Sequence, residues 1–115
     1  AADVRVQGDS LMLERALGNV LVNAIHHTPA GGTVSLVVSQ QAGLAVICIT
    51  NSGPPIPAAA MEQIFDRFVR LDGQSEGSGL GLAITRSIVL AHGGRVSVGA
   101  GEQSTAFTIT LPLAQ

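Results

Sequence analysis

Apolar residues recur at helical spacing in three stretches of the chain, over residues 11–27, 58–68 and 80–92. Positions three and four apart are apolar, which is typical of helices that pack one face against a core. Residues 28–32 end the first stretch and Gly93–Gly94 end the third, because proline and glycine rarely continue a helix. The pattern therefore predicts three helices. The first of them is predicted from the spacing of its apolar residues, which are Leu13, Ala16, Leu17, Val20, Leu21, Ala24 and Ile25.

Shorter stretches that are rich in β-branched residues surround these helices, at residues 4–7, 33–39, 44–50, 95–99 and 105–111. Such residues favour strands. The second and third stretches are joined by a tight turn that contains glycine, which predicts a hairpin, and the last two form a second hairpin. Helices and strands alternate without repeats or a linker. We therefore expect one layered α/β domain that covers residues 1–115.

Composition narrows the class of protein. The chain has 115 residues, of which 46% are hydrophobic and 12% charged, with a formal net charge of −2. This balance excludes a disordered segment, and the absence of a basic excess argues against a nucleic-acid binder. No apolar run approaches the roughly 20 residues that span a bilayer. All six basic residues are Arg, and a single cysteine, Cys48, excludes an internal disulfide.

Four polar side chains share one side of the first predicted helix. At about 100° per residue, Arg15, Asn19, Asn23 and His26 fall within roughly 80° of one another. Asparagine is a poor helix former because its side chain competes for backbone hydrogen bonds. Two interpretations stay open here: plain exposure to solvent, or a row of amide oxygens that faces a polar ligand or a hydrated Mg²⁺.

A glycine-rich run precedes the third predicted helix, with Gly77, Gly79 and Gly81 at alternate positions. Backbone N–H groups in such a run can hold phosphate at the start of a helix. A dinucleotide-binding fold would need its glycines directly after a strand, and a P-loop would need a lysine, which this chain lacks. The run is therefore a phosphate-binding loop of another kind, or a flexible joint.

Asn51, Ser52 and Gly53 follow directly on a predicted strand. A polar side chain beside a glycine at this point could read the edge of a nucleotide base. The same residues are also ordinary turn formers. The motif alone is weak evidence for a nucleotide site, and it becomes stronger together with the polar side of the first helix and the glycine-rich run.

In this order and at these distances, the motifs resemble the nucleotide-binding catalytic domain of sensor histidine kinases. Residues 17–29 resemble that family's N box, residues 51–53 its first glycine box, residues 64–68 its F box and residues 77–81 its second glycine box. Residues 91–94 also fit. The resemblance covers essentially the whole chain. It implies a two-layer α/β sandwich in which a mixed sheet of about five strands is backed by three helices.

The resemblance further implies that ATP is held between the helix layer and a flexible lid at about residues 69–79. Residues 51–57 and 76–79 are most similar to heavy-metal-responsive sensor kinases. The lid is short, because only residues 73–75 separate Asp72 from Glu76. Several more residues would be expected there.

Roles follow from the resemblance one position at a time. Asn23 corresponds to the family's Mg²⁺ ligand, and Asn19 to the asparagine that organises phosphates and metal, so these two are the expected catalytic residues. Phe65 and Phe68 are expected to anchor the lid, and Arg70 to reach phosphate from it. The positions expected to bind the cofactors ATP and Mg²⁺ are Asn19, Asn23, His26, His27, Asn51, Gly53, Ile56, Phe65, Phe68, Arg70, Gly77, Gly79, Leu80, Gly81 and Leu82.

Two positions depart from the family pattern. Asn51 stands where an Asp usually reads the base, and Pro55 stands where a glycine is usual. The adjacent His26 and His27 occupy positions near the phosphates. Their side chains point about 100° apart on a helix, which disfavours a metal ion shared between them.

The residue at position 19 separates two enzyme classes. Hydrolysing members of the same fold superfamily, such as topoisomerases and chaperones, carry a Glu there as general base. Asn19 cannot accept a proton at neutral pH, so transfer of a phosphoryl group to a protein histidine is expected instead of hydrolysis. Two alternatives stay open: an ATP-hydrolysing member of the superfamily, and a nucleotide-sensing module without transfer activity.

The resemblance also implies partners. The phospho-accepting histidine is expected on a separate dimerisation domain of the same kinase, with a response regulator downstream. His26, His27 and His92 are poor substitutes for it, so this domain is not expected to phosphorylate itself. We expect a monomeric cytoplasmic domain of an inner-membrane sensor kinase that makes no direct membrane contact and binds no nucleic acid.

Overall fold

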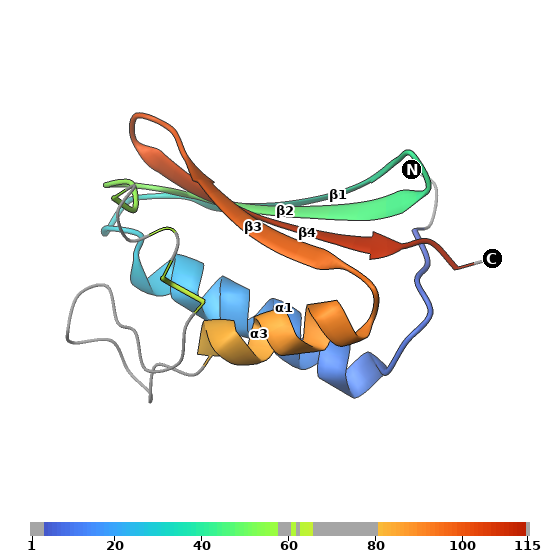
Figure 1. The fold of residues 1–115 in the computed structure, drawn as a ribbon. Coiled ribbons are helices and arrows are strands. Elements are labelled where there is room, and N and C mark those ends of the chain that lie inside the picture. The colour runs from blue at the N-terminus through green and yellow to red at the C-terminus, as the bar shows by residue number, and fades with distance from the viewer. Residues whose placement is uncertain (1–3, 58–60, 62, 66–80, 115) are drawn as a thin grey trace.

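The described part of the protein forms two layers, a sheet and a pair of helices on one face of it (Figure 1). The computed structural model describes residues 4–57, 61, 63–65 and 81–114. The helices are α1 (Ser10–His26) and α3 (Gly81–Ala91), and the strands are β1 (Val34–Gln41), β2 (Leu44–Ser52), β3 (Arg95–Ala100) and β4 (Ser104–Pro112). The strands form one sheet in the order β1-β2-β4-β3, and every neighbouring pair is antiparallel.

Local chemistry explains where these elements begin and turn. Asp9 caps α1, because its carboxylate Oδ1 accepts a hydrogen bond from the Met12 N–H at 3.0 Å. The turn between β1 and β2 has two residues, Ala42 and Gly43, with φ angles of 51° and 81°. Two positive φ angles match the twist of a two-residue hairpin. The two predicted hairpins are therefore confirmed.

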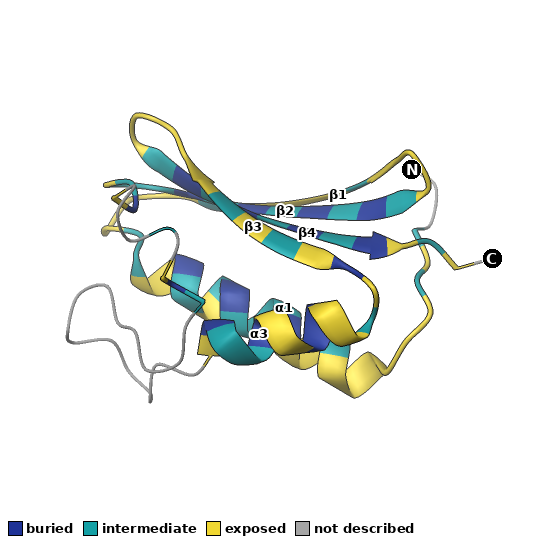
Figure 2. Ribbon diagram, viewed as in Figure 1, coloured by how far each residue is buried: buried dark blue, intermediate teal, exposed yellow. Residues whose placement is uncertain are grey.

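The core lies between the layers and is built from alternate positions of the two central strands. Figure 2 shows these strands as an alternation of buried and less buried residues. Phe107 and Ile49 are fully buried, and Val20 of α1 packs into the same cluster. Strands that bury one face alternate in this way because successive side chains point to opposite faces. The buried face of the sheet thus fixes the distance between the sheet and α1.

Two expectations about the sheet are wrong. Among the described residues the sheet has four strands and no parallel pair, whereas about five strands in a mixed sheet were expected. The segment predicted as a strand at residues 4–7 makes one antiparallel bridge, Val6 to Leu113. Beside this bridge, the Ala114 N–H donates to the Arg5 carbonyl at 2.7 Å, while the Leu113 N–H donates to the Gly43 carbonyl at 3.2 Å.

Two of the three expected helices lie within the described residues. α1 and α3 match the first and third predicted helices to within one residue at each end, counting only the described residues. Of the stretch predicted as the middle helix, residues 58–68, Met61 is helical and residues 63–65 form a turn. The remaining residues of that stretch lie outside the described part of the chain.

Candidate functional site

One end of the sandwich collects the candidate residues. The last turn of α1, the end of β2 and the start of α3 meet there (Figure 1), because α1 and α3 run in opposite directions beside the sheet. Each described residue of the expected set lies on these elements or on the segment that follows β2. Phe68, Arg70, Gly77, Gly79, Leu80 and the expected lid at residues 69–79 lie outside the described residues.

Two buried polar atoms at this end have no hydrogen-bond partner. They are Oδ1 of Asn23 and Nε2 of His27, and they are the only such side-chain atoms in the described parts of the chain. The two residues are one helical turn apart, so the atoms come from the same side of α1. An unpaired buried polar atom costs about 1–3 kcal/mol. A ligand that supplies the missing partners removes this cost.

The Asn23 oxygen fits a hard divalent cation. Mg²⁺ prefers oxygen ligands and keeps several waters when it is bound through one or two protein groups. A neutral amide oxygen can serve as one such ligand, and the phosphate oxygens of a nucleotide can supply others. The residue that the sequence proposes for Mg²⁺ is thus the residue whose oxygen the protein leaves without a partner.

Asn19 has a contact that the sequence did not reveal. Its amide Nδ2 donates a hydrogen bond to the Gly81 carbonyl oxygen at 3.1 Å. Gly81 is the first residue of α3, and a Cβ atom placed there would lie 3.7 Å from Cγ of Asn19. Asn19 therefore links the middle of α1 to the start of α3 through one of its two amide N–H groups.

The first glycine box is held against the end of the N box. Gly53 has a φ of 119°, which L side chains rarely adopt, and a Cβ there would lie 2.6 Å from Cδ of Pro29. Ser52 Oγ accepts a hydrogen bond from the Thr33 N–H at 2.8 Å, and the Ser52 N–H donates to the Thr33 carbonyl at 2.9 Å. These contacts bring residues 28–33 onto the end of β2.

Asn51 lies on the buried face of β2, with only 2% of its surface exposed. Its amide Nδ2 donates a hydrogen bond to the Ser52 carbonyl at 3.3 Å. This bond uses one of the two N–H groups of the amide, and no hydrogen bond from a protein group to the acceptor Oδ1 is seen among the described residues. An acceptor at this position matches the amino group of adenine better than the carbonyl of guanine.

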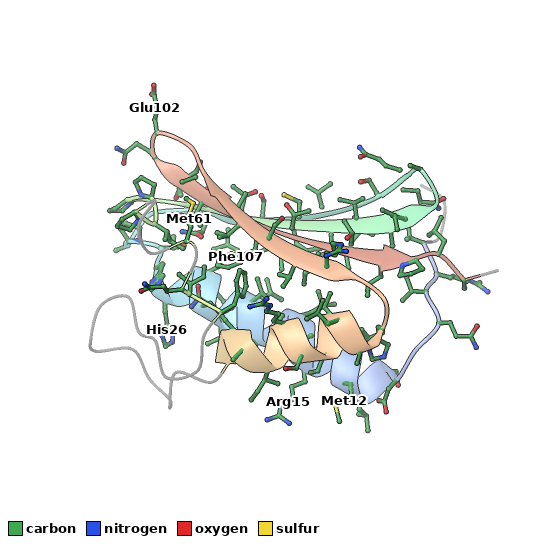
Figure 3. All side chains as sticks on the ribbon, in the orientation of Figure 1. Met12, Arg15, His26, Met61, Glu102 and Phe107 are labelled. Carbon is green, nitrogen blue, oxygen red and sulfur yellow. The ribbon has the colours of Figure 1, made fainter. Side chains whose placement is uncertain are left out.

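Four other expected residues differ in their exposure. Ile56 is 6% exposed, and its N–H donates to Thr105 Oγ1 at 3.2 Å, while Leu82 is 9% exposed in the core. Phe65 packs edge-on against Phe107, with ring centroids 6.1 Å apart. His26 is exposed (Figure 3). Packing accounts for the first three residues, and a contact of any of the four with a ligand stays a prediction.

Sequence reasoning missed three polar residues that position these elements. Thr85 Oγ1 donates to the Ala16 carbonyl at 3.0 Å inside the core, and the Thr105 hydroxyl accepts from Ile56. His92 contacts Asp9 and Ile88 at the far end of the helix pair. The available signal is the polar residue at a position that a helix or strand buries, because a buried polar group needs a partner.

The fold and the site together define an ATP-binding α/β sandwich. Residues 8–115 match the family model described as "Histidine kinase-, DNA gyrase B-, and HSP90-like ATPase", and the chain belongs to this family. The domain is the catalytic, ATP-binding part of sensor histidine kinases. The resemblance seen in the sequence is confirmed at this level.

Named relatives support the same family. Sensor histidine kinase CusS of Escherichia coli K12 is 45% identical over 112 residues, which cover 94% of this chain and 23% of the relative. This chain thus spans about a quarter of the length of that protein. The solved structure of the mycobacterial sensor histidine kinase MprB superposes with a TM-score of 0.87 at 41% identity, covering 94% of this chain and 76% of that one.

A second solved structure contains a partner. Histidine kinase ThkA in complex with response regulator protein TrrA superposes with a TM-score of 0.83 at 30% identity, over 99% of this chain and 32% of the kinase.

Within the described residues of the present chain, neither helix is long and apolar enough to cross a bilayer.

Proposed function

We propose that this domain binds ATP with Mg²⁺ and donates the γ-phosphate to a histidine on a separate dimerisation domain of a sensor kinase. The observation that carries the proposal is the unpartnered, buried Oδ1 of Asn23 in a domain of the ATPase family. This oxygen would hold Mg²⁺, which neutralises charge on the phosphates when it is bound. Asn51 Oδ1 would accept from the adenine amino group.

The nature of residue 19 supports transfer over hydrolysis. An amide cannot remove a proton from water, and Nδ2 of Asn19 already donates to the Gly81 carbonyl. Phosphoryl transfer depends mainly on the position of the groups and on charge neutralisation, so it can proceed with an acceptor histidine that is itself the nucleophile. Asn19 in this proposal positions the start of α3 beside the phosphates and activates no water.

The surrounding assembly is proposed from the relatives. A response regulator is the proposed downstream partner, since a related kinase has been solved with one. Membrane-anchored sensor kinases place this domain in the cytoplasm, and the same location is proposed here. The resemblance of residues 51–57 and 76–79 to heavy-metal-responsive kinases makes a metal ion the proposed signal.

One experiment separates this function from its alternatives. The domain is incubated with γ-labelled ATP and Mg²⁺, alone and with the dimerisation domain of the protein that contains it. We expect binding in both cases and label only on the added domain. Label on His26, His27 or His92 of the domain alone would contradict the proposal. Rapid release of phosphate in the absence of an acceptor would indicate the hydrolysing alternative, and binding without any transfer would indicate the sensing module.

A further inference from the structure

Three hydrogen bonds join α1 and α3 or the residues that flank them, and each pairs a side chain with a backbone group. Asn19 Nδ2 donates to the Gly81 carbonyl, Thr85 Oγ1 to the Ala16 carbonyl, and the Asp9 N–H to Nε2 of His92. The partner on the side of α1 rises from residue 9 to 19 as that on the side of α3 falls from 92 to 81, as antiparallel helices require. The contacts therefore fix how far one helix is shifted along the other.

The contact between Asp9 and His92 requires one particular tautomer of the His92 ring. Nδ1 of His92 lies 2.8 Å from the Ile88 carbonyl oxygen, and a carbonyl can only accept, so Nδ1 carries the proton. Nε2 lies 3.1 Å from the Asp9 nitrogen, which can only donate, so Nε2 is the acceptor. Both bonds exist together only in the neutral ring with its proton on Nδ1. We call this pair of bonds the His92 bridge.

The His92 bridge connects the ends of two helices. Asp9 is the residue that caps α1 through its carboxylate, and Ile88 lies in the last turn of α3. The chain makes room for the ring at Gly8, where a Cβ atom would collide with Cδ2 of His92 and lie 2.7 Å from Nε2. The ring therefore reaches Asp9 because residue 8 has no side chain.

We propose that His92 is a remote positioning residue for the nucleotide site. α3 is a continuous helix of 11 residues, about 16 Å long, so fixing its last turn against the cap of α1 also fixes its first residue. That first residue, Gly81, meets the Asn19 amide. Loss of the bond to Asp9 lets α3 move along α1, which changes the contact between Asn19 and Gly81 at the other end. This inference rests on the proposed function only for its effect on ATP.

Two substitutions of His92 separate its two bonds. Asn carries its amide near the position of Nδ1, so His92→Asn can still donate to Ile88 but cannot reach Asp9. Gln carries its amide near the position of Nε2, so His92→Gln can still accept from Asp9 and loses the bond to Ile88. Each variant thus loses a different bond. Only His92→Asn loses the bond to Asp9 at the start of α1, so His92→Gln serves as the matched control.

The first measurement is the side-chain amide resonance of Asn19 in the nucleotide-free protein, recorded by NMR. We expect it to shift in His92→Asn and to stay near its wild-type position in His92→Gln. An unchanged resonance in both variants would overturn the proposal, and so would an equal shift in both. The ¹⁵N shifts of the His92 ring in the wild-type protein need no variant, and a ring protonated at Nε2 would also overturn it.

The second measurement is the affinity for Mg-ATP. We expect a Kd that is roughly threefold to tenfold higher in His92→Asn, and near the wild-type value in His92→Gln. A wild-type protein that does not bind Mg-ATP would contradict the proposed function, while the Asn19 resonance would still decide the coupling between the two helix ends. An unchanged Kd in a His92→Asn protein that shows the shift would overturn the link to the nucleotide site.

Discussion

The two ends of the α1–α3 pair differ in whether their polar side-chain atoms have hydrogen-bond partners within the protein. At the end near Asp9 and His92, both ring nitrogens and the capping carboxylate have partners within the protein. At the other end, Oδ1 of Asn23 and Nε2 of His27 are buried without one. The helix pair thus has its buried polar atoms paired at one end and has two without a partner, among the described residues, at the other.

The difference indicates which polar groups serve structure and which serve a ligand. A buried polar group that stabilises the fold has its partner in the fold, because an unpaired one lowers stability. Groups left without partners lower the stability of the protein alone, and their cost is removed when a ligand binds. Substitutions should therefore act on catalysis most strongly at the end near Asn23, and on the free energy of unfolding most strongly at the end near His92. The predictions below use this difference.

The largest effect is expected at the ligand end, for Asn23→Ala. Loss of Oδ1 should lower the rate of phosphotransfer by about a hundredfold or more and remove the Mg²⁺ dependence of nucleotide binding. The free energy of unfolding should change by less than about 1 kcal/mol, because the lost oxygen has no partner and Ala is the better helix former. Transfer assays and nucleotide titrations with and without Mg²⁺ test this.

Val22→Ala is the control for Asn23→Ala, since Val22 lies on the same helix with 54% of its surface exposed. It should change neither activity nor Mg²⁺ dependence. Retention of the Mg²⁺ dependence in Asn23→Ala would show that the metal is held by other residues, and the comparison between the two helix ends would lose its main support.

At the saturated end, Gly8→Ala should destabilise the fold. The new methyl group would overlap the His92 ring, and overpacking of this kind costs about 1–3 kcal/mol. Urea denaturation measures the change. Gly99→Ala is the matched control, because a Cβ there meets no atom within 4 Å, and it should stay within about 0.5 kcal/mol of the wild type. Equal stabilities of the two variants would mean that the ring does not approach Gly8.

A smaller effect is expected where the base would bind. Asn51→Asp should raise the ratio of ATP to GTP affinity by about fivefold to tenfold, close to 1 kcal/mol, because a carboxylate accepts from the adenine amino group with charge assistance and repels guanine O6. Titration of both nucleotides into the wild type and the variant gives the ratio. A ratio that stays level or falls would show that Asn51 does not contact the base edge.

The smallest effect is expected between the two ends, at Gly18. This glycine lies inside α1, and a Cβ there meets no atom within 4 Å. Gly18→Ala should stabilise the protein by about 0.5–1 kcal/mol, because glycine loses more backbone entropy in a helix than alanine. Thermal unfolding tests the sign. A destabilised variant would indicate that this side of α1 is covered in the folded protein.

Much of the fold could be predicted from neighbouring residues. The first helix was expected at residues 11–27 and is found at 10–26, and both hairpins lie where β-branched stretches flank a glycine turn. The segment at residues 4–7 shows the limit of such reasoning. Its alternation is that of a strand, but among the described residues it makes a single bridge, from Val6 to Leu113. Pairing depends on a partner strand distant in the sequence, which local alternation does not specify.

Local sequence likewise predicts some features of the candidate site but not others. The amide row of α1 and the glycine at position 53 could be read from residue type and spacing, because helical periodicity and glycine's tolerance of positive φ are local properties. The contacts that hold α1 against α3, by contrast, join residues 62, 69 and 83 positions apart: Asn19 with Gly81, Ala16 with Thr85 and Asp9 with His92. Such pairs form only when the sheet has brought α1 and α3 together. Which polar atoms then remain without a partner depends on the packing of the whole domain, so the local sequence pattern does not predict which atoms these are.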